Sequence, residues 1–449
     1  PVAGRVYLFS AETGALIRTF DHPYPATAAG FGYAVSAIMD MDNDGVEDVV
    51  IGSPFDVLAR GTTIYGESGR VFIFSGKTGQ LLRTHSSPNI KAQGRFGMSV
   101  AAPHGYFWAG DWYPTSRQGL LGNVRLVVGE PGGGPDGGGR AYALGDQNNT
   151  LVYELPNPEE GEGEDAAAGV NFGQSVSLAG YFSFPGESGG GGGCSIMVGA
   201  PGAGGTGMVF QTECNTLQYY GPWASSMNQQ GAQYGRVVTQ LDWLGPREFP
   251  LVAPGMASSL PRYDAAAIVD AGAVEVYLPQ SVWDISYSPK GRSQYAGFNA
   301  VHPQPQIDAQ FGSSISYLMN QPPGYELVYD PIRAIAVAVP NQDVGLTIDQ
   351  GLVYLYNIYG DVLGVIGSPN PQAGAHFGSA MTSLADYLLW GASYLAVSAP
   401  DESVNGRTGQ GRVYLFEARS ISKTDSDQDG LYDAWETILG TNPNNSDTD

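Results

Sequence analysis

Lysine, histidine and cysteine are scarce in this chain of 449 residues, and long apolar runs are absent. Four lysines, five histidines and two cysteines stand beside 44 acidic residues, and the formal net charge is −23. Such a charge argues against nucleic acid and anionic membrane surfaces as partners, because both attract basic proteins. No apolar stretch approaches the ~18 residues of a membrane span, so no transmembrane segment is expected. Strong acidity suits a soluble extracellular protein and, equally, a calcium binder.

Glycine and proline are abundant, with 64 and 30 residues. The glycines form no collagen-like triplet, so we expect them in many tight turns. Apolar residues make up 42% of the chain and aromatic residues 11%, which excludes intrinsic disorder.

Internal repetition is the most informative feature of the sequence. The segment GRVYLFSAETGALIRT at Gly4–Thr19 recurs as GRVFIFSGKTGQLLRT at Gly69–Thr84. A Phe-Gly or Tyr-Gly pair opens a strand six times, at Phe31, Phe96, Phe172, Tyr234, Phe311 and Phe377. Each pair is followed by a β-branched run that ends near a proline, and then by a glycine and a further strand. These prolines are Pro54, Pro131, Pro201, Pro254, Pro340 and Pro400.

Each unit therefore contains four short strands, A to D, with alternating apolar residues. One such sheet cannot bury both faces, but several arranged around an axis can, which predicts an all-β protein with a β-propeller fold. We count six A, six B, seven C and six D strands. A C–D pair without A and B strands lies at the N-terminus, and the last C strand, at 411–417, has no D partner.

Three arrangements account for this uneven count. We favour a seven-bladed ring with strands upstream of residue 1. The alternatives are a six-bladed ring, in which N-terminal residues supply the last D strand, and strand donation from a neighbouring subunit. The third arrangement would make the chain a possible homopolymer with strand sharing.

The repeated Phe-Gly, Gly-x-Pro and Gly-x-Val-Tyr elements resemble the FG-GAP repeats of integrin alpha chains and their bacterial relatives. The resemblance covers residues 1 to about 418, and we assign 1–420 to this propeller domain. It implies binding of protein or glycan partners through loops, a structural or adhesive role, and no enzymatic activity.

An acidic loop in the first unit, DMDNDGVEDVV, predicts a calcium site. Asp40, Asp42, Asp44 and Asp48 stand at positions 1, 3, 5 and 9, and Val46 can offer its carbonyl at position 7. This spacing curls hard oxygen ligands around one cation, and it is similar to the FG-GAP calcium loop.

A second calcium loop, DSDQDGLYDAWE, is predicted near the C-terminus. Its candidate ligands fit the EF-hand spacing: Asp425, Asp427, Asp429, Leu431 through its carbonyl, Asp433 and Glu436. A short helix should follow. The segment resembles the calcium-binding repeats of bacterial thrombospondin type 3-like regions, and we assign 421–449 to this truncated module.

The two cysteines flank a predicted hairpin centred on Gly204, which would place Cys194 opposite Cys214. A disulfide between them would imply an oxidising compartment; the alternative is two free, half-buried thiols.

The loop at 104–123 is rich in aromatic residues: Tyr106, Phe107, Trp108, Trp112 and Tyr113. These aromatic residues form either an exposed interface or packing between blades.

Two catalytic-looking motifs are discounted. GAGGTG at Gly202–Gly207 precedes a strand instead of the helix that a dinucleotide site needs. GESGG at Gly186–Gly190 lies in a polyglycine loop, not a strand–turn–helix elbow. We therefore predict a secreted, calcium-binding and non-enzymatic protein of a bacterial surface, an adhesive or assembly component of a surface layer, filament or matrix. The alternatives are a glycan-binding lectin or the accessory propeller of a secreted hydrolase.

Overall fold

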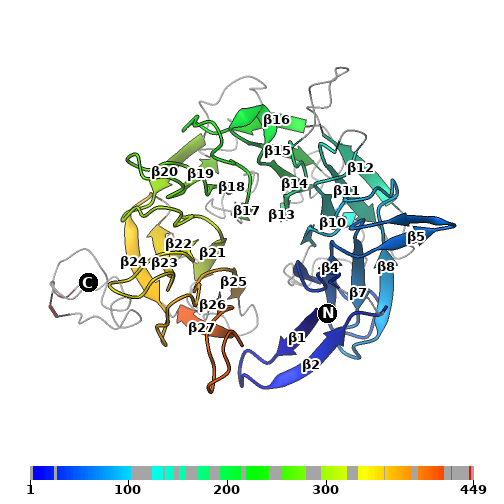
Figure 1. Cartoon of the computed structure of the whole chain (residues 1–449), viewed down its shortest axis with the longest axis horizontal. Helices are drawn as coiled ribbons and strands as arrows, with labels where there is room; N and C mark the ends of the chain where they lie inside the picture. Colours follow the sequence, from blue (N-terminus) through cyan, green and yellow to red (C-terminus); the bar gives the residue numbers. More distant parts are fainter. Residues whose placement is uncertain are drawn as a thin grey trace, which may run out of the picture. The chain divides into compact units, whose positions relative to one another are not determined.

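The computed structural model describes most of the chain. The described residues are 4–24, 28–102, 124–134, 137–145, 151–157, 169–181, 193–213, 219–241, 255–279, 295–320, 332–357, 359–385, 393–418, 426 and 444–445. They form an all-β protein, a β-propeller with six blades, whose sheets follow one another along the chain (Figure 1). The one helical element among them is a 3-10 turn, Ala203–Gly205, and none of the described helix is long and apolar enough to cross a membrane.

Each blade is an antiparallel sheet whose strands pair in the order in which they follow along the chain, and in blade 1 the β5–β6 hairpin lies between its second and third strands in the sequence. Blade 1 contains β3 (Val35–Ile38), β4 (Asp48–Ser53), β7 (Arg70–Phe74) and β8 (Leu81–His85). Blade 2 contains β9 (Ser99–Ala101), β10 (Val124–Glu130), β11 (Arg140–Gly145) and β12 (Leu151–Pro156). Blade 3 contains β13 (Ser175–Tyr181), β14 (Gly193–Ala200), β15 (Met208–Glu213) and β16 (Tyr219–Ala224).

The remaining blades repeat the same order. Blade 4 contains β17 (Val238–Leu241), β18 (Gly255–Leu260), β19 (Ala273–Pro279) and β20 (Tyr295–Val301). Blade 5 contains β21 (Ile315–Asn320), β22 (Ile332–Val339), β23 (Leu352–Asn357) and β24 (Val362–Gly367). Blade 6 has three described strands, β25 (Met381–Ala385), β26 (Ser393–Ala399) and β27 (Arg412–Ala418). By their contacts, the strands fall into two compact units that divide between Pro254 and Gly255.

Two further strand pairs complete the described sheets. β1 (Arg5–Phe9) and β2 (Leu16–Asp21) form a sheet of their own at the N-terminus. β5 (Leu58–Arg60) and β6 (Thr63–Tyr65) form a small hairpin in the B–C loop of blade 1, which the sequence analysis did not predict. The described strands thus reproduce the predicted six A, six B, seven C and six D strands, but the seven-bladed ring that we favoured is not confirmed, because these strands form six blades.

Successive blades are joined where a glycine meets the Phe-Gly turn of the next blade. Gly69, which precedes β7, has a φ of +84°, and a Cβ built there would lie 2.1 Å from the carbonyl oxygen of Phe96. The backbone N–H of Phe96 donates to the carbonyl of Ser68 at 3.0 Å. Only glycine allows this backbone approach, which explains why the Gly and the Phe-Gly recur together.

The β1–β2 pair packs on blade 1 through the same joint. A Cβ on Gly4 would lie 2.1 Å from the carbonyl oxygen of Phe31. Phe20 of β2 is buried in one cluster with Phe31 and Phe72, and Val6 and Leu8 of β1 pack against that cluster. The pair therefore occupies the place of the C and D strands of a preceding blade.

Candidate metal centre

The acidic loop of blade 1 connects β3 to β4 and consists mainly of bends. Gly45 has a φ of +87°, which lets the chain turn back after Asp44. The loop therefore folds onto the start of β4, where Asp48 is the first residue and is buried.

Three carboxylates converge in this loop. One ligand oxygen from each of Asp40, Asp42 and Asp48 lies within 4.8 Å of the others. Asp42 is exposed, Asp40 is half-buried and Asp48 is buried, so the group forms a cup open to solvent on one side. Across the described part of the chain, this is the one place where three acidic, histidine or cysteine side chains come so close.

Burial and hydrogen bonds from backbone N–H groups shift the pKa values of the carboxyl groups in this cup. Burial alone raises the pKa of Asp40, but the N–H groups of Gly45, Asp44 and Asn43 hold it below its ordinary value. Burial raises the pKa of Asp48 to about 6, against the hydrogen bonds from Met41 and Gly76. Three carboxylates at this spacing repel one another, and a divalent cation would remove that repulsion.

Asp44, at position 5 of the predicted calcium loop, has other contacts in this structure. Its carboxylate accepts hydrogen bonds from Ser75 Oγ at 3.1 Å and from the N–H of Val46 at 2.9 Å. The Nζ of Lys77 donates to the Asp44 carbonyl at 2.7 Å. These contacts tie the loop to the turn between β7 and β8, where Gly76 also donates to Asp48 at 3.1 Å.

The donor set fits a hard divalent cation. All side-chain candidates are carboxylates, and calcium prefers six to eight oxygen ligands with flexible geometry. Asp40, Asp42 and Asp48 would hold the ion, with Asp44 and the carbonyl of Val46 close enough in sequence to join them. Such an ion would neutralise the cup and fasten β3 to β4.

The other predicted site residues lie outside the described residues. This applies to the C-terminal calcium loop, with Asp425, Asp427, Asp429, Leu431, Asp433 and Glu436, and to the aromatic loop, with Tyr106, Phe107, Trp108, Trp112 and Tyr113. Cys194 belongs to β14, whereas Cys214 is not described. These assignments stay predictions.

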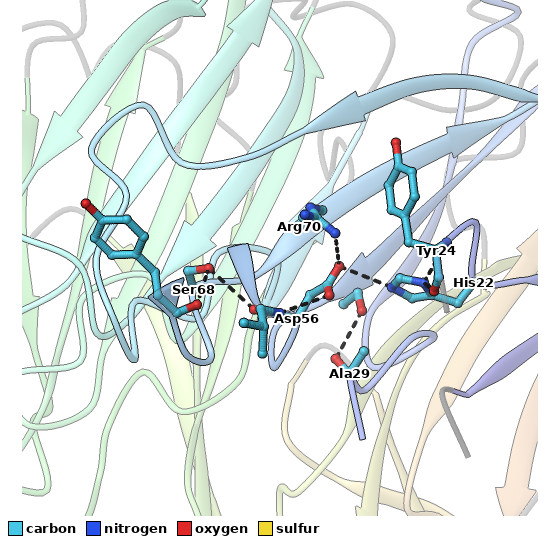
Figure 2. A network of polar contacts seen from close by, with 9 residues as sticks. His22, Tyr24, Ala29, Asp56, Ser68 and Arg70 are labelled. Carbon is cyan, nitrogen blue, oxygen red and sulfur yellow. Dashed lines mark hydrogen bonds and ion pairs between the residues drawn. The ribbon is translucent and has the colours of Figure 1, made fainter. Parts of the chain in front are cut away.

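A buried polar network joins β2 to blade 1, and the sequence analysis missed it (Figure 2). Oδ2 of Asp56 lies 3.2 Å from Nε2 of His22 and 2.9 Å from Nη1 of Arg70. Both His22 and Asp56 have side chains that are 2% exposed. The guanidinium of Arg70 also covers the ring of Tyr24, at 5.0 Å from its centroid.

This network is a joint and not a catalytic triad. Among the described residues, His22 is hydrogen-bonded with Asp56 and the backbone of Tyr24, and neither is the nucleophile that a triad places beside the imidazole. A buried acid also lies at or just after the second strand of two other blades: Glu130 is the last residue of β10 in blade 2, and Glu402 follows β26 in blade 6. Glu402 pairs with Arg412 at 3.2 Å.

A cavity of about 430 Å³ opens between loops of blades 4 and 5. Its lining combines aliphatic and polar residues: Ile268, Pro305, Gln306, Ile307, Asn341, Asp343, Ile348 and Asp349. Two lining residues, Ile307 and Ile348, are exposed, and so are Val269 and Leu346, which stand close to lining residues in the sequence; we call these four residues the blade 4–5 rim. Isolated apolar side chains are common on surfaces, and these four, in the loops that line the cavity, form a candidate contact surface.

Residues 31–74 match the model of the FG-GAP repeat. This FG-GAP segment contains the Phe-Gly turn, the acidic loop and the C strand of blade 1. Mouse integrin alpha-2 is 32% identical over 95 residues, which cover 21% of this chain and 7% of that protein. Mouse integrin alpha-3 is 30% identical over 114 residues, with coverage of 24% and 9%. Integrin alpha-5 of Xenopus laevis is 30% identical over 137 residues, with coverage of 28% and 12%.

The matches span small parts of these relatives, between 7% and 12% of their length. Among solved structures, the WD40 repeats of RRP9 superpose with a TM-score of 0.48 and 11% identity, covering 92% of this chain and 87% of that one. Likeness at this level does not bear on function. The FG-GAP repeat and the likeness to integrin alpha chains are therefore the findings that guide the functional proposal.

Proposed function

We propose that the chain is an extracellular, calcium-stabilised propeller with an adhesive or structural role, which binds a protein partner through its loops and performs no chemistry. The observation that carries the proposal is the carboxylate cup at Asp40, Asp42 and Asp48 inside the segment that matches the FG-GAP repeat. The likeness to integrin alpha chains supports the adhesive role.

Calcium binding is tested by titration calorimetry on the whole chain after chelation. We expect one fewer bound calcium in Asp42→Ala than in the wild type, and Glu12→Ala, which changes an exposed acid in the β1–β2 turn, should bind as the wild type does. The comparison between variants is needed because the C-terminal loop is predicted to hold a second ion. Equal calcium stoichiometry in Asp42→Ala and the wild type would contradict the site.

The blade 4–5 rim supports binding of a protein rather than a glycan. Two of its four apolar side chains, Ile307 and Ile348, line a cavity that Asp343 and Asp349 also line, a combination that suits a partner with apolar and basic residues. Sugar-binding pockets commonly stack an aromatic ring on the sugar, and the lining of this cavity contains none.

Adhesion is tested with beads that carry the whole chain, incubated with immobilised extracellular-matrix proteins and, in parallel, with a glycan array. We expect saturable binding to a protein surface, and we expect Ile348→Asp to reduce it strongly without changing the melting temperature. Ile64→Asp, an exposed apolar residue of β6, is the matched control and should bind as the wild type does. Binding to glycans alone would favour a lectin instead.

A further inference from the structure

The turn between β7 and β8 contacts both the acidic loop of blade 1 and strand β2. It comprises residues 75–80, and we call it the blade 1 turn. Its first two residues, Ser75 and Gly76, are buried. A Cβ on Gly76 would lie 2.0 Å from the carbonyl oxygen of Glu47 in the acidic loop. Only glycine allows so close an approach of two backbones, so the turn and the loop are packed against each other.

Three hydrogen bonds connect the blade 1 turn to the acidic loop. The N–H of Gly76 donates to Oδ1 of Asp48 at 3.1 Å, and Oγ of Ser75 donates to Oδ2 of Asp44 at 3.1 Å. Nζ of Lys77 donates to the carbonyl oxygen of Asp44 at 2.7 Å. Partners of this kind, which bind the ligands and not the ion, orient the ligands of a metal site. The turn therefore positions Asp48 and the loop backbone.

Arg18 of β2 binds the same turn. Its Nη1 donates to the carbonyl oxygen of Thr78 at 2.6 Å, and its Nη2 donates to the carbonyl oxygen of Lys77. The stem of the side chain passes beside Gly79, where a Cβ would lie 2.7 Å from Cδ of Arg18. A planar guanidinium with several donors suits two neighbouring acceptors, and a lysine ammonium does not replace it. Arg18 therefore fixes the turn relative to β2.

Two residues of the turn take part in both sets of contacts. Lys77 accepts from Arg18 through its carbonyl and donates to Asp44 through its Nζ. Thr78 also accepts from Arg18 through its carbonyl, and its N–H donates at 3.0 Å to Oγ of Ser75, the hydroxyl that donates to Asp44. Two continuous series of contacts thus lead from Arg18 to the acidic loop.

We propose that Arg18 couples calcium binding at the acidic loop to the docking of the β1–β2 pair on blade 1. This inference rests on the calcium site of the proposed function. With a cation bound, Asp48 and the loop backbone are held in place, and the blade 1 turn keeps its carbonyls against Arg18. Coupling free energies are reciprocal. The docked pair therefore raises calcium affinity by the factor by which calcium stabilises docking.

The first test measures calcium affinity in the whole chain and in Arg18→Met, which keeps an unbranched side chain beside Gly79 and loses both donors. Titration calorimetry after chelation gives the affinity, and the binding step that Asp42→Ala abolishes is the one at the acidic loop. We expect Arg18→Met to bind calcium at this step about fivefold more weakly than the wild type. Arg18→Lys, which keeps the charge, should recover part of the loss.

Arg5→Met is the matched control. Arg5 belongs to the same strand pair and lies 2.5 Å from Asp21, but both side chains are more than half exposed. Because exposed ion pairs contribute little, and because Arg5 does not contact the blade 1 turn among the described residues, this variant should bind calcium as the wild type does.

The second test measures the reciprocal effect by hydrogen exchange and mass spectrometry. Calcium should slow the exchange of β2 amides about fivefold in the wild type and in Arg5→Met, and should leave it nearly unchanged in Arg18→Met. Strand β15 of blade 3 is the internal reference, and its exchange should respond less than that of β2.

Failure of the coupling and failure of the calcium site give different results. If Asp42→Ala abolishes no binding step, both are wrong. If that step has the same affinity in Arg18→Met and in the wild type, the calcium site stands and the coupling is overturned. This holds even where Arg18→Met lowers the melting temperature, because Arg18 then stabilises the fold alone. Calcium that slows exchange equally in β2 and β15, or in neither, would also overturn the coupling.

Discussion

The hydroxyl of Ser87 donates a 2.9 Å hydrogen bond to Oε2 of Glu130. Ser87 follows the last strand of blade 1, and Glu130 ends the second strand of blade 2. Glu130 is fully buried, and its Oε1 has no hydrogen-bond partner. Burial raises the pKa of Glu130 to about 7, although Ser87, Tyr142 and the charge of Arg140 act in the opposite direction. One joint between blades therefore contains a carboxyl group that resists ionisation.

The buried Glu130, at the joint between blades 1 and 2, should make the free energy of unfolding depend on pH. The folded state binds this proton more tightly than the unfolded state, whose carboxyl titrates near the ordinary value of 4.5, so the contribution of Glu130 to stability falls as pH rises from about 4.5 through about 7. We expect Glu130→Gln to raise the free energy of unfolding at pH 8 by on the order of 2–3 kcal/mol and to leave it nearly unchanged at pH 4.

Denaturant unfolding at both pH values measures this difference. Glu12→Gln, an exposed acid, is the control and should differ little from the wild type at either pH. A Glu130→Gln variant that is less stable than the wild type at pH 8 would contradict the prediction, because it would mean that the ionised carboxylate stabilises the joint.

The glycine at a blade joint should tolerate no side chain. A Cβ on Gly69 would lie 2.1 Å from the carbonyl of Phe96, whereas one on Gly231 would meet nothing within 4 Å. Both glycines have a positive φ, +84° and +81°, so Gly231→Ala carries the cost of the backbone conformation alone, about 1 kcal/mol. We expect Gly69→Ala to lower the free energy of unfolding, measured in urea, by several kcal/mol more than Gly231→Ala does. If both variants lost the same free energy of unfolding, the backbone at the joint would be able to move aside for the methyl group.

The sequence predicted the features that repeat. Strand order and register follow from period-2 alternation and from the Gly and Phe-Gly signals, and β14 and β15 do pair about the predicted centre at Gly204, with Ser195 opposite Glu213. The acidic cup could be predicted because Asp40 to Asp48 are close in sequence. The contacts of the buried acids Asp56 and Glu130 could not be predicted, because each acid has a partner from the preceding sheet: His22 is 34 residues from Asp56, and Ser87 is 43 from Glu130.

The number of blades could not be predicted for a related reason. Sequence shows which strands exist but not which edges find a neighbour, and the surplus C strand fits more than one arrangement. β1 and β27 carry the same five residues, RVYLF, at Arg5–Phe9 and Arg412–Phe416. One sequence thus occurs beside β2 and beside β26, so local preference does not decide its neighbour.

The members of the acidic loop should contribute unequally to calcium binding. Asp42 belongs to the convergent group, whereas the carboxylate of Asp44 is hydrogen-bonded to Ser75 and Val46. We therefore expect Asp42→Asn to abolish binding at the loop, and Asp44→Asn to weaken it by a smaller factor. Calcium at 100 times its Kd should stabilise the wild type by about 2.7 kcal/mol and Asp42→Asn by less. Calorimetry and thermal melting with and without calcium measure both effects. An equal loss of calcium affinity in the two variants would mean that the Asp44 carboxylate turns to the ion when it binds.

Cys194 and Cys214 should form a disulfide. The described register of β14 and β15 extends to Ser195 opposite Glu213, and each cysteine is the next residue along its chain segment. Opposed positions of an antiparallel pair bring Cβ atoms to the separation that a disulfide needs. Closing a loop of this size should stabilise the fold by about 3 kcal/mol. Reduction should therefore lower the melting temperature of the wild type but not of the double variant Cys194→Ser, Cys214→Ser. Mass spectrometry of unreduced peptides detects the bond directly, and alkylation of both thiols in the native oxidised protein would refute it.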